Sequence, residues 1–104
     1  MILRVFQVTV HNGKAEEFEQ FFQEIAIPQV KKWPGLISMS AGKPQPGASN
    51  TFCMTMIWKD LDALKTFAGE DWSQARIEPE EEHLIASISL SHYDLMAASG
   101  AIDL

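Results

Sequence analysis

The sequence is short of cysteine, of basic residues and of long apolar runs, and each shortage excludes a class of protein. Its one cysteine, Cys53, cannot form an internal disulfide, so we expect a protein of the reducing cytoplasm. Lys and Arg number 8 against 14 Asp and Glu, which gives a net charge of −6. Such a chain repels polyanions, and no apolar run approaches the roughly 20 residues that a membrane span needs. We therefore expect neither nucleic acid nor a membrane as partner.

The length of 104 residues suits one compact domain and is too short for two. Periodic patterns end near residue 94, so residues 1–94 form the predicted core of a single domain that spans 1–104. Residues 95–104 are predicted to be a C-terminal tail, which is either mobile or draped over a partner.

Alternating and β-branched residues mark four strands, and two helical patterns separate them. The predicted strands are Ile2–Val10, Leu36–Gly42, Thr51–Trp58 and Leu84–Tyr93, and the predicted helices run from Lys14 to Trp33 and from Asp60 to Gly69. Asn12 is the predicted N-cap of the first helix, and Pro28 predicts a kink or a break inside it. Strand, helix and strand, twice over, predict an α+β fold: a ferredoxin-like β-α-β-β-α-β plan with an antiparallel four-stranded sheet.

Both faces of the predicted sheet carry apolar side chains. The strand Thr51–Trp58 offers Phe52, Met54, Met56 and Trp58 to one face and Cys53, Thr55 and Ile57 to the other. Two helices can cover only one face, so the second face needs a partner. A second copy of the same sheet, packed face to face, is the economical solution, and we therefore expect a homodimer.

The three histidines are the first candidates for chemistry. His11 and His83 are predicted to share one end of the sheet, whereas His92 lies nine residues further along an extended strand, roughly 30 Å from His83. We therefore expect no metal site, and no spacing matches a closed zinc site. His83 follows a run of glutamates and is either a solvated turn residue or a functional group near carboxylates. His92 shares the apolar face of its strand and is either a hydrogen-bonded core histidine or a functional group.

Trp72 lies in an acidic turn after the second helix. Its ring either packs as part of a lid or lines the mouth of a cavity between helices and sheet. The neighbouring Glu78, Glu80, Glu81 and Glu82 are predicted to form a solvated turn. The sequence contains no Ser-His-Asp set, phosphate-binding loop or dinucleotide-binding fingerprint. The residues taken singly therefore predict no particular reaction.

The second half of the chain resembles a known family. A helix end and acidic turn, Phe67-Ala68-Gly69-Glu70-Asp71-Trp72-Ser73-Gln74-Ala75-Arg76-Ile77, continue through Pro79-Glu80-Glu81-Glu82-His83 to a strand that closes on His92-Tyr93-Asp94. The upstream parts of the same pattern are Trp58, Pro34-Gly35-Leu36, Phe18, Phe21 and Phe22. Together they are similar to the antibiotic biosynthesis monooxygenase family, of the dimeric α/β-barrel superfamily. The resemblance covers nearly the whole chain and implies a dimeric α/β barrel.

The resemblance implies an activity as well as a fold. Members with known activity oxygenate polycyclic phenols without metal, flavin or other cofactor, in a cavity where the deprotonated substrate ring reacts with dioxygen. Such a reaction needs a dry pocket, a group that accepts or shares the phenolic proton, and aromatic walls. By position and chemistry we assign His92, His83 and Trp72 as catalytic residues. The expected lining of the substrate pocket is Phe22, Met54, Met56, Phe67 and Trp58.

A related branch of the family degrades haem with an Asn near the end of the first strand and a Trp and a His further on. Asn12 is available, but Phe67 and Ile77 stand where the Trp and the His would be expected, so no cofactor is predicted. Three functions stay open: a cofactor-independent monooxygenase acting on a small aromatic or quinone-like metabolite, a non-catalytic module that binds a hydrophobic small molecule, and a dimeric stress-related protein with a filled interior. An open cavity favours the first two.

Overall fold

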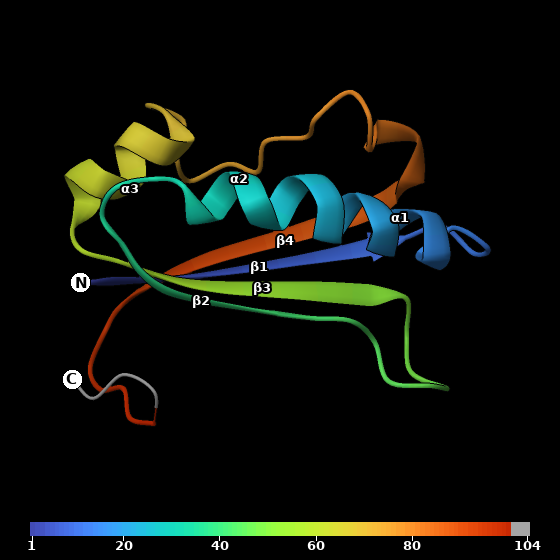
Figure 1. Ribbon diagram of the computed structural model, residues 1–104, viewed down its shortest axis with the longest axis horizontal. Helices are drawn as coiled ribbons and strands as arrows, with labels where there is room; N and C mark the ends of the chain where they lie inside the picture. The colour runs from blue at the N-terminus through green and yellow to red at the C-terminus, as the bar shows by residue number, and fades with distance from the viewer. Residues whose placement is uncertain (101–104) are drawn as a thin grey trace.

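The computed structural model describes residues 1–100, which form a four-stranded antiparallel sheet with its helices on one side (Figure 1). The strands are β1 (Ile2–Val10), β2 (Leu36–Gly42), β3 (Thr51–Trp58) and β4 (Ile85–Asp94). Their order in the sheet is β2-β3-β1-β4, so β1 lies between β3 and β4. The ferredoxin-like α+β plan predicted from the sequence is confirmed.

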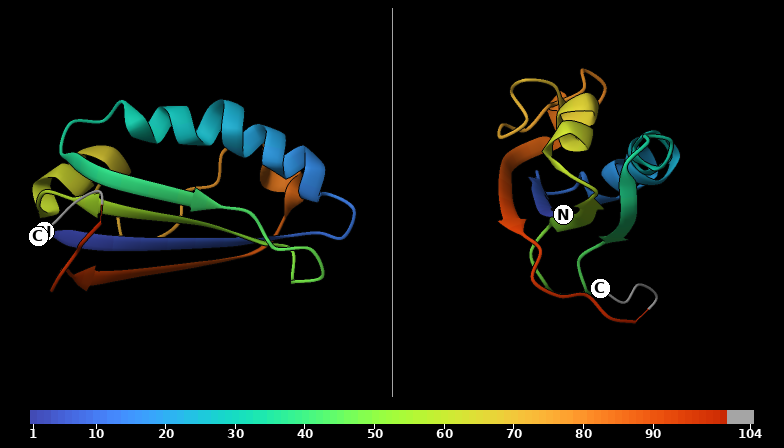
Figure 2. Two further views of the ribbon diagram at one scale, coloured as in Figure 1. Left: turned by 60° about the horizontal axis from the view of Figure 1, so that its bottom comes forward. Right: turned by 90° about the vertical axis from the view of Figure 1, so that its left-hand side faces the viewer.

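The side chains of β3 alternate between the two faces of the sheet. Phe52, Met54, Met56 and Trp58 lie under the helices and are each at most 3% exposed, whereas the residues between them are half-buried. Figure 2 shows that the helices lie on the same side of the sheet. Within residues 1–100 no helix covers the opposite face. The sheet of one chain is therefore open and does not close into a barrel by itself.

Three helical segments follow one another without a gap: α1 (Ala15–Phe21), the π-helical η1 (Phe22–Ala26) and α2 (Ile27–Lys31). The backbone N–H of Ile27 donates to the carbonyl oxygen of Phe22, five residues earlier, which widens the turn in front of Pro28. Pro28 then stands in the first turn of α2, where its missing N–H is tolerated. Of the expected kink or break at Pro28, the break is therefore wrong, and the irregularity of the helical run is the π turn that precedes Pro28.

The start of the first helical run also differs from the prediction. Asn12 is not its N-cap, because the residue in front of α1 is Lys14, and Lys14 makes no capping bond with its side chain. The Oδ1 atom of Asn12 instead accepts a hydrogen bond from Nδ2 of Asn50 at 3.1 Å, which joins the two loops at this end of the sheet.

The helix α3 (Leu61–Ala68) begins and ends where the sequence predicts. Oδ1 of Asp60 accepts a hydrogen bond from the backbone N–H of Ala63 at 2.8 Å, and Gly69 follows the last turn with a φ of +87°. Gly35, with a φ of +88°, precedes β2, and a Cβ atom there would collide with Cβ of Ala63. The turn into β2 thus packs directly against α3.

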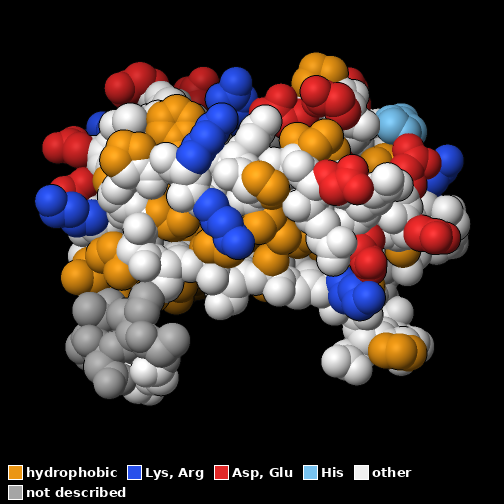
Figure 3. All heavy atoms as spheres, in the orientation of Figure 1, with side chains coloured by type: hydrophobic (Ala, Val, Ile, Leu, Met, Phe, Trp, Pro, Cys, Tyr) orange, Lys and Arg blue, Asp and Glu red, His pale blue; other side chains and the backbone are white. Residues whose placement is uncertain are grey.

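A short 3-10 helix, η2 (Glu82–Leu84), leads into β4, so Leu84 belongs to this turn and not to the strand. Residues 95–100 form neither helix nor strand, and the remainder of the predicted tail, 101–104, lies outside the described residues. Within residues 1–100 no helix is long and apolar enough to cross a membrane. The face drawn in Figure 3 exposes both Lys and Arg and Asp and Glu side chains.

Candidate functional site

A cavity of about 290 Å³ lies between the helices and the sheet. Most of its wall is apolar, and much of that wall is aromatic: Phe6, Phe18, Phe21, Phe22, Trp33 and Phe67. Gln29, Lys32 and Arg76 are exposed lining residues and form the mouth. Ligand pockets start at about this size, so the cavity suits a small ring compound.

Arg4 extends from β1 into one end of this cavity and is only 5% exposed. Its Nη1 donates to the carbonyl oxygen of Trp72 at 2.7 Å and to Nε2 of His92 at 2.9 Å. Its guanidinium carbon lies 5.8 Å from the centre of the Phe67 ring, within the range of a cation–π contact. Burial lowers the pKa of Arg4 to about 10, so the side chain stays charged at neutral pH.

His92 is held as a neutral acceptor by this contact. Because a guanidinium can only donate, Nε2 of His92 accepts, and the ring proton is on Nδ1. Burial, and secondly the charge of Arg4, lower the pKa of His92. The Trp72 ring stands edge-on to the imidazole at 4.9 Å between ring centres. The structure thus brings two predicted catalytic residues, His92 and Trp72, together. Neither of them lines the cavity, but both bond to Arg4, which does.

His83, the third predicted catalytic residue, lies elsewhere. It belongs to η2, and its exposed ring bonds to Oε2 of Glu17 on α1 through Nε2 at 2.9 Å. It is not among the residues that line the cavity. His83 therefore ties the segment before β4 to the first helix and does not join His92 and Trp72.

Glu81 is the buried acid of the cavity, with only 6% of its surface exposed. Burial raises its pKa to about 7, and the charges of Glu78 and Glu80 add to the shift, while a hydrogen bond with the backbone of Glu78 opposes it. A carboxyl group with this pKa can both accept and return a proton at neutral pH. The prediction of a solvated glutamate turn is therefore wrong for Glu81, although Glu80 and Glu82 are exposed.

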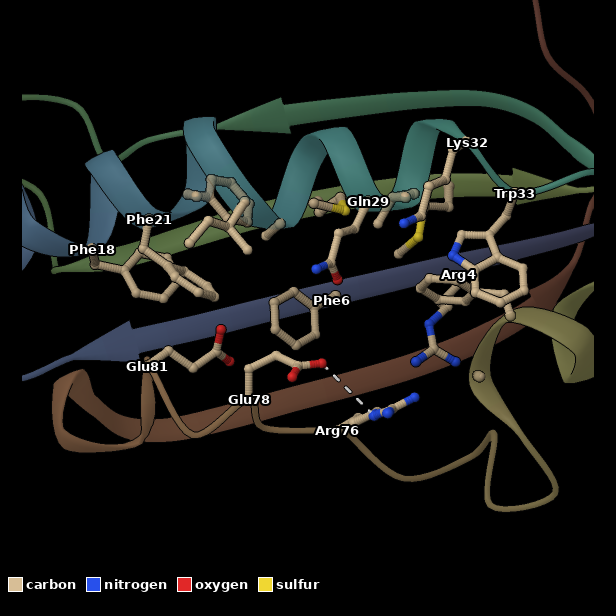
Figure 4. Close-up of a pocket in the computed structure, with 18 residues that line it drawn as sticks. Arg4, Phe6, Phe18, Phe21, Gln29, Lys32, Trp33, Arg76, Glu78 and Glu81 are labelled. Atoms are coloured by element: carbon tan, nitrogen blue, oxygen red, sulfur yellow. Dashed lines mark ion pairs between the residues drawn. The ribbon is translucent and has the colours of Figure 1, made fainter.

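The cationic side chains of the cavity and its buried carboxyl group lie toward opposite ends. Figure 4 shows Arg4 and Arg76 toward the end marked by Trp33, with Glu81 toward the opposite end and Phe6 between them. The only ion pair drawn among them joins Nε of Arg76 to Oε1 of Glu78 at 3.8 Å. A bound ring would therefore meet a cation at one edge and a carboxyl group at the other.

Four of the five side chains predicted to line the pocket do so: Phe22, Met54, Met56 and Phe67. Trp58 is fully buried and lies behind Phe67, with the two rings stacked at 4.8 Å between centres. Trp58 thus fixes the orientation of a wall residue and does not itself face the cavity.

Arg4 and Glu81 were both missed by the sequence prediction. A signal for Arg4 exists, because it occupies the same face of its strand as Ile2, Phe6 and Val8, where a charged side chain must be buried. No comparable signal exists for Glu81, since nothing in the sequence distinguishes it from the other glutamates of its turn.

The residues of the cavity do not fit haem. Haem iron is held in proteins by a His, a Cys or a Tyr, or by a Met together with a His; among residues 1–100 the cavity is lined by Met54 and Met56 but by no His, Cys or Tyr. Phe67 occupies the wall, and Ile77 is 45% exposed. In the same part of the chain, no group of three or more His, Cys, Asp or Glu side chains is placed to hold a metal ion.

Fold and cavity together define a ferredoxin-like α+β protein with a pocket for a small ligand between its sheet and its helices. The family model for antibiotic biosynthesis monooxygenase matches residues 1–84, and the chain belongs to this family. The resemblance seen in the sequence is thereby confirmed. The matched part includes Arg4 and Glu81, whereas His92 lies beyond it. No curated protein matches the sequence.

Solved structures share the fold at low sequence identity. A protein of unknown function from Nitrosomonas europaea superposes with a TM-score of 0.74 at 15% identity, covering 97% of this chain and 94% of that chain. SnoaB, a cofactor-independent oxygenase from Streptomyces nogalater, gives a TM-score of 0.68 at 18% identity, over 93% and 94% of the two chains. MhuD, solved with two manganese protoporphyrin IX molecules per active site, gives 0.70 at 18%, over 97% and 100%. At these identities the likeness concerns the fold alone.

Proposed function

We propose that the protein is a cytoplasmic, cofactor-independent monooxygenase that acts on a small aromatic or quinone-like metabolite. Membership of the family supports a monooxygenase-type function at family level. The observation that carries the narrower proposal is Glu81, a buried carboxyl group with a pKa of about 7 on the wall of a largely aromatic cavity. The same cavity argues against a stress-related protein with a filled interior.

The proposed reaction needs only a base, the bound ring and dioxygen. Glu81 accepts the proton of a phenolic or enolic hydroxyl group, which leaves an electron-rich ring in a mostly apolar cavity. The ring reduces dioxygen: one oxygen atom replaces the hydrogen on a ring carbon and becomes a carbonyl group, and the other leaves as water with that hydrogen and with the proton that Glu81 returns. The substrate supplies all four electrons, so no external reductant is required.

His92 and Trp72 act in this scheme by positioning. Both accept hydrogen bonds from Nη1 of Arg4, and they therefore hold a cation at the end of the cavity remote from Glu81. The Phe6 and Phe67 rings orient the substrate between the two ends. His83 has no part in the scheme, because its ring bonds to Glu17 outside the cavity lining.

Oxygen consumption with anthrone- or quinol-type substrates tests the proposal. We expect a product that contains one atom from labelled dioxygen, and a loss of about 100-fold or more in kcat for Glu81→Gln, the typical contribution of a general base. His92→Ala should also lose activity while staying folded, whereas Trp72→Phe keeps the backbone carbonyl oxygen that holds Arg4 and should lose much less. The matched control is Glu82→Gln, which changes an exposed neighbour that does not contribute to the pKa shift of Glu81. Turnover that Glu81→Gln leaves intact refutes the assignment, and tight binding without oxygen uptake points to a non-catalytic binding module.

We further propose that two copies pack through the sheet face that carries no helix. Ile57, Leu3 and Tyr93 stand side by side on β3, β1 and β4 and form an apolar row across this face. Leu3 and Ile57 are only half-buried in the single chain, and Tyr93 is 55% exposed. A self-complementary apolar face of this kind favours a two-fold dimer.

A further inference from the structure

The charge of Arg4 is not neutralised by the described chain. Its Nη1 bonds to two neutral acceptors, the carbonyl oxygen of Trp72 and the imidazole of His92. Its Nε is sealed from solvent and has no hydrogen-bond partner. Within residues 1–100, no carboxylate forms an ion pair with Arg4, although Glu78 and Glu81 reach the same cavity. A buried cation without a counter-ion is costly, and an anionic ligand would relieve that cost.

The neighbours of Arg4 reinforce this positive end. Lys32 contributes a further cation at the mouth, whereas the charge of Arg76, which lies toward the same end in Figure 4, is offset by its ion pair with Glu78. Glu78 pairs with Arg76 and leaves Arg4 uncompensated. Phe67 packs under the guanidinium, so an anion bound there would have an aromatic wall beside it. The low dielectric of such a site strengthens the attraction between opposite charges.

Glu81 constrains what the anion can be. In the proposed function the phenolic hydroxyl group gives its proton to Glu81, and Glu81 lies at the end of the cavity away from Arg4. The partner of Arg4 must therefore be a second group of the same ligand, one that is already negative before any proton transfer. A carboxylate meets this requirement, and it matches the planar donors of a guanidinium.

We propose that the natural ligand is a small aromatic carboxylic acid, whose carboxylate binds Arg4 and whose ring lies against Phe6 and Phe67. The inference rests on the proposed function for the placement of the hydroxyl group at Glu81, yet it concerns binding and not oxygenation. His92 and Trp72 are positioning residues for this subsite, because they fix the guanidinium that meets the carboxylate.

Equilibrium binding of matched probes tests this subsite without any reaction. The probes are 2-naphthoate, the neutral 2-naphthylmethanol of nearly the same shape, and 2-naphthol, which carries only a phenolic group. We expect 2-naphthoate to bind at least about tenfold more tightly than the alcohol at pH 7, the minimum for one charge-assisted hydrogen bond. Titration calorimetry measures all three, and 2-naphthol should bind like the alcohol at this pH.

Variants identify the residue responsible. Arg4→Met removes the charge and leaves a shorter, unbranched apolar side chain, and it should abolish the preference for 2-naphthoate over the alcohol. The matched control Lys32→Met removes a cation at the exposed mouth, and the preference should survive it. Should Arg4→Met fail to fold, Arg4→Lys replaces it. Arg4→Lys keeps the positive charge but lacks the planar guanidinium group, so the preference for 2-naphthoate over the alcohol should shrink at least threefold.

Three results overturn the inference: equal affinity for the acid and the alcohol, a preference that persists in Arg4→Met, or tighter binding of 2-naphthol than of 2-naphthoate. The last result would identify the anion as a phenolate and not a carboxylate. None of these measurements involves dioxygen. A protein that binds the acid through Arg4 and consumes no oxygen contradicts the proposed function alone, and one that oxidises neutral phenols without preferring acids contradicts this inference alone.

Discussion

Arg4 and His92 face each other across β1 and β4 as direct partners in the strand register, and Nη1 of Arg4 lies 2.9 Å from Nε2 of His92. Residues directly opposite on one face of an antiparallel pair are the closest neighbours in a sheet. The register therefore brings a cation and an imidazole together on the helix-covered face. His92, which the sequence predicts to be a catalytic residue, therefore bonds to Arg4 and does not itself line the cavity.

The first prediction concerns the protonation of His92. Burial and the charge of Arg4 lower the pKa of His92, so its ring should titrate below the ordinary value of about 6.5. In Arg4→Met the pKa should rise, because the repelling charge is gone, but it should stay below the ordinary value, because the ring remains buried. The ring-proton chemical shifts of His92, followed by NMR against pH, measure both values. If the pKa of His92 is the same in the parent protein and in Arg4→Met, the charge of Arg4 does not affect the protonation of the His92 ring.

The lowered pKa of His92 also makes the free energy of unfolding depend on pH. A lowered pKa in the folded state means that the unfolded chain binds the His92 proton more readily. The contribution of His92 to stability is therefore complete above about pH 6.5 and is lost as the pH falls through that value toward the lower pKa of the folded state.

The second prediction concerns Glu81, whose effect on the free energy of unfolding changes with pH in the opposite direction to that of His92. Its folded pKa of about 7 lies above the ordinary value of 4.5, so between these values the unfolded chain releases the proton and the folded protein keeps it. The free energy of unfolding should therefore fall by about 2 kcal/mol from pH 4.5 to pH 7 on account of Glu81. Glu81→Gln removes this dependence, and at pH 8 the variant should be more stable than the parent.

Urea unfolding at several pH values provides the measurement for Glu81. The matched control is Glu82→Gln, whose side chain is exposed and is not among the groups that shift the pKa of Glu81, so the pH profile of the parent protein should stay unchanged. If Glu81→Gln and the parent protein follow parallel curves from pH 4.5 to pH 8, Glu81 is solvated in solution. Glu81 would then also be unsuited to the role of base in the proposed reaction.

The strands and α3 could be predicted from sequence because local patterns determine them. Alternation over Thr51–Trp58 fixed the buried face of β3, and Asp60 and Gly69 marked the ends of α3. The break expected at Pro28 failed because the π turn before it rearranges the hydrogen bonds, which no propensity of single residues describes. Asn12 failed as a cap because a distant loop residue, Asn50, takes its side chain.

The candidate site could be predicted only in part, because which polar side chains are buried and paired in it depends on contacts between segments that are distant in the sequence. The predicted wall residues Phe67 and Met54 follow from strand and helix periodicity. The pairing of His92 with Arg4 depends on the register between the first and last strands of the chain, which the sequence pattern leaves open. Glu81 lines the cavity together with Phe18 and Phe21 of the first helical run, where tertiary contacts bury it, while Glu80 beside it is exposed.

The third prediction concerns the packing of Gly35 against α3. Gly35→Ala forces an L-residue to a φ of +88°, and its Cβ collides with Cβ of Ala63. The positive φ should cost about 1–2 kcal/mol, and the collision a further ~1–3 kcal/mol. Gly13→Ala is the matched control, since Gly13 has a φ of +82° but no atom within 4 Å of the added Cβ. Thermal unfolding of both variants should show the larger loss at position 35, and equal losses would mean that α3 moves aside.

The fourth prediction concerns the dimer and depends on the apolar row that Ile57 forms with Leu3 and Tyr93. A charge introduced at Ile57 would be buried without a counter-ion if two sheets pack face to face, so Ile57→Lys should weaken association at least about 30-fold, or roughly 2 kcal/mol. Leu61→Lys is the control, because Leu61 is 38% exposed on α3, which covers the other face. Sedimentation at micromolar concentration should show a dimer for the parent protein and for Leu61→Lys, and the 11.6 kDa monomer for Ile57→Lys. A parent protein that sediments only as the monomer contradicts the proposed assembly, and the open sheet would then need a different partner for its second face.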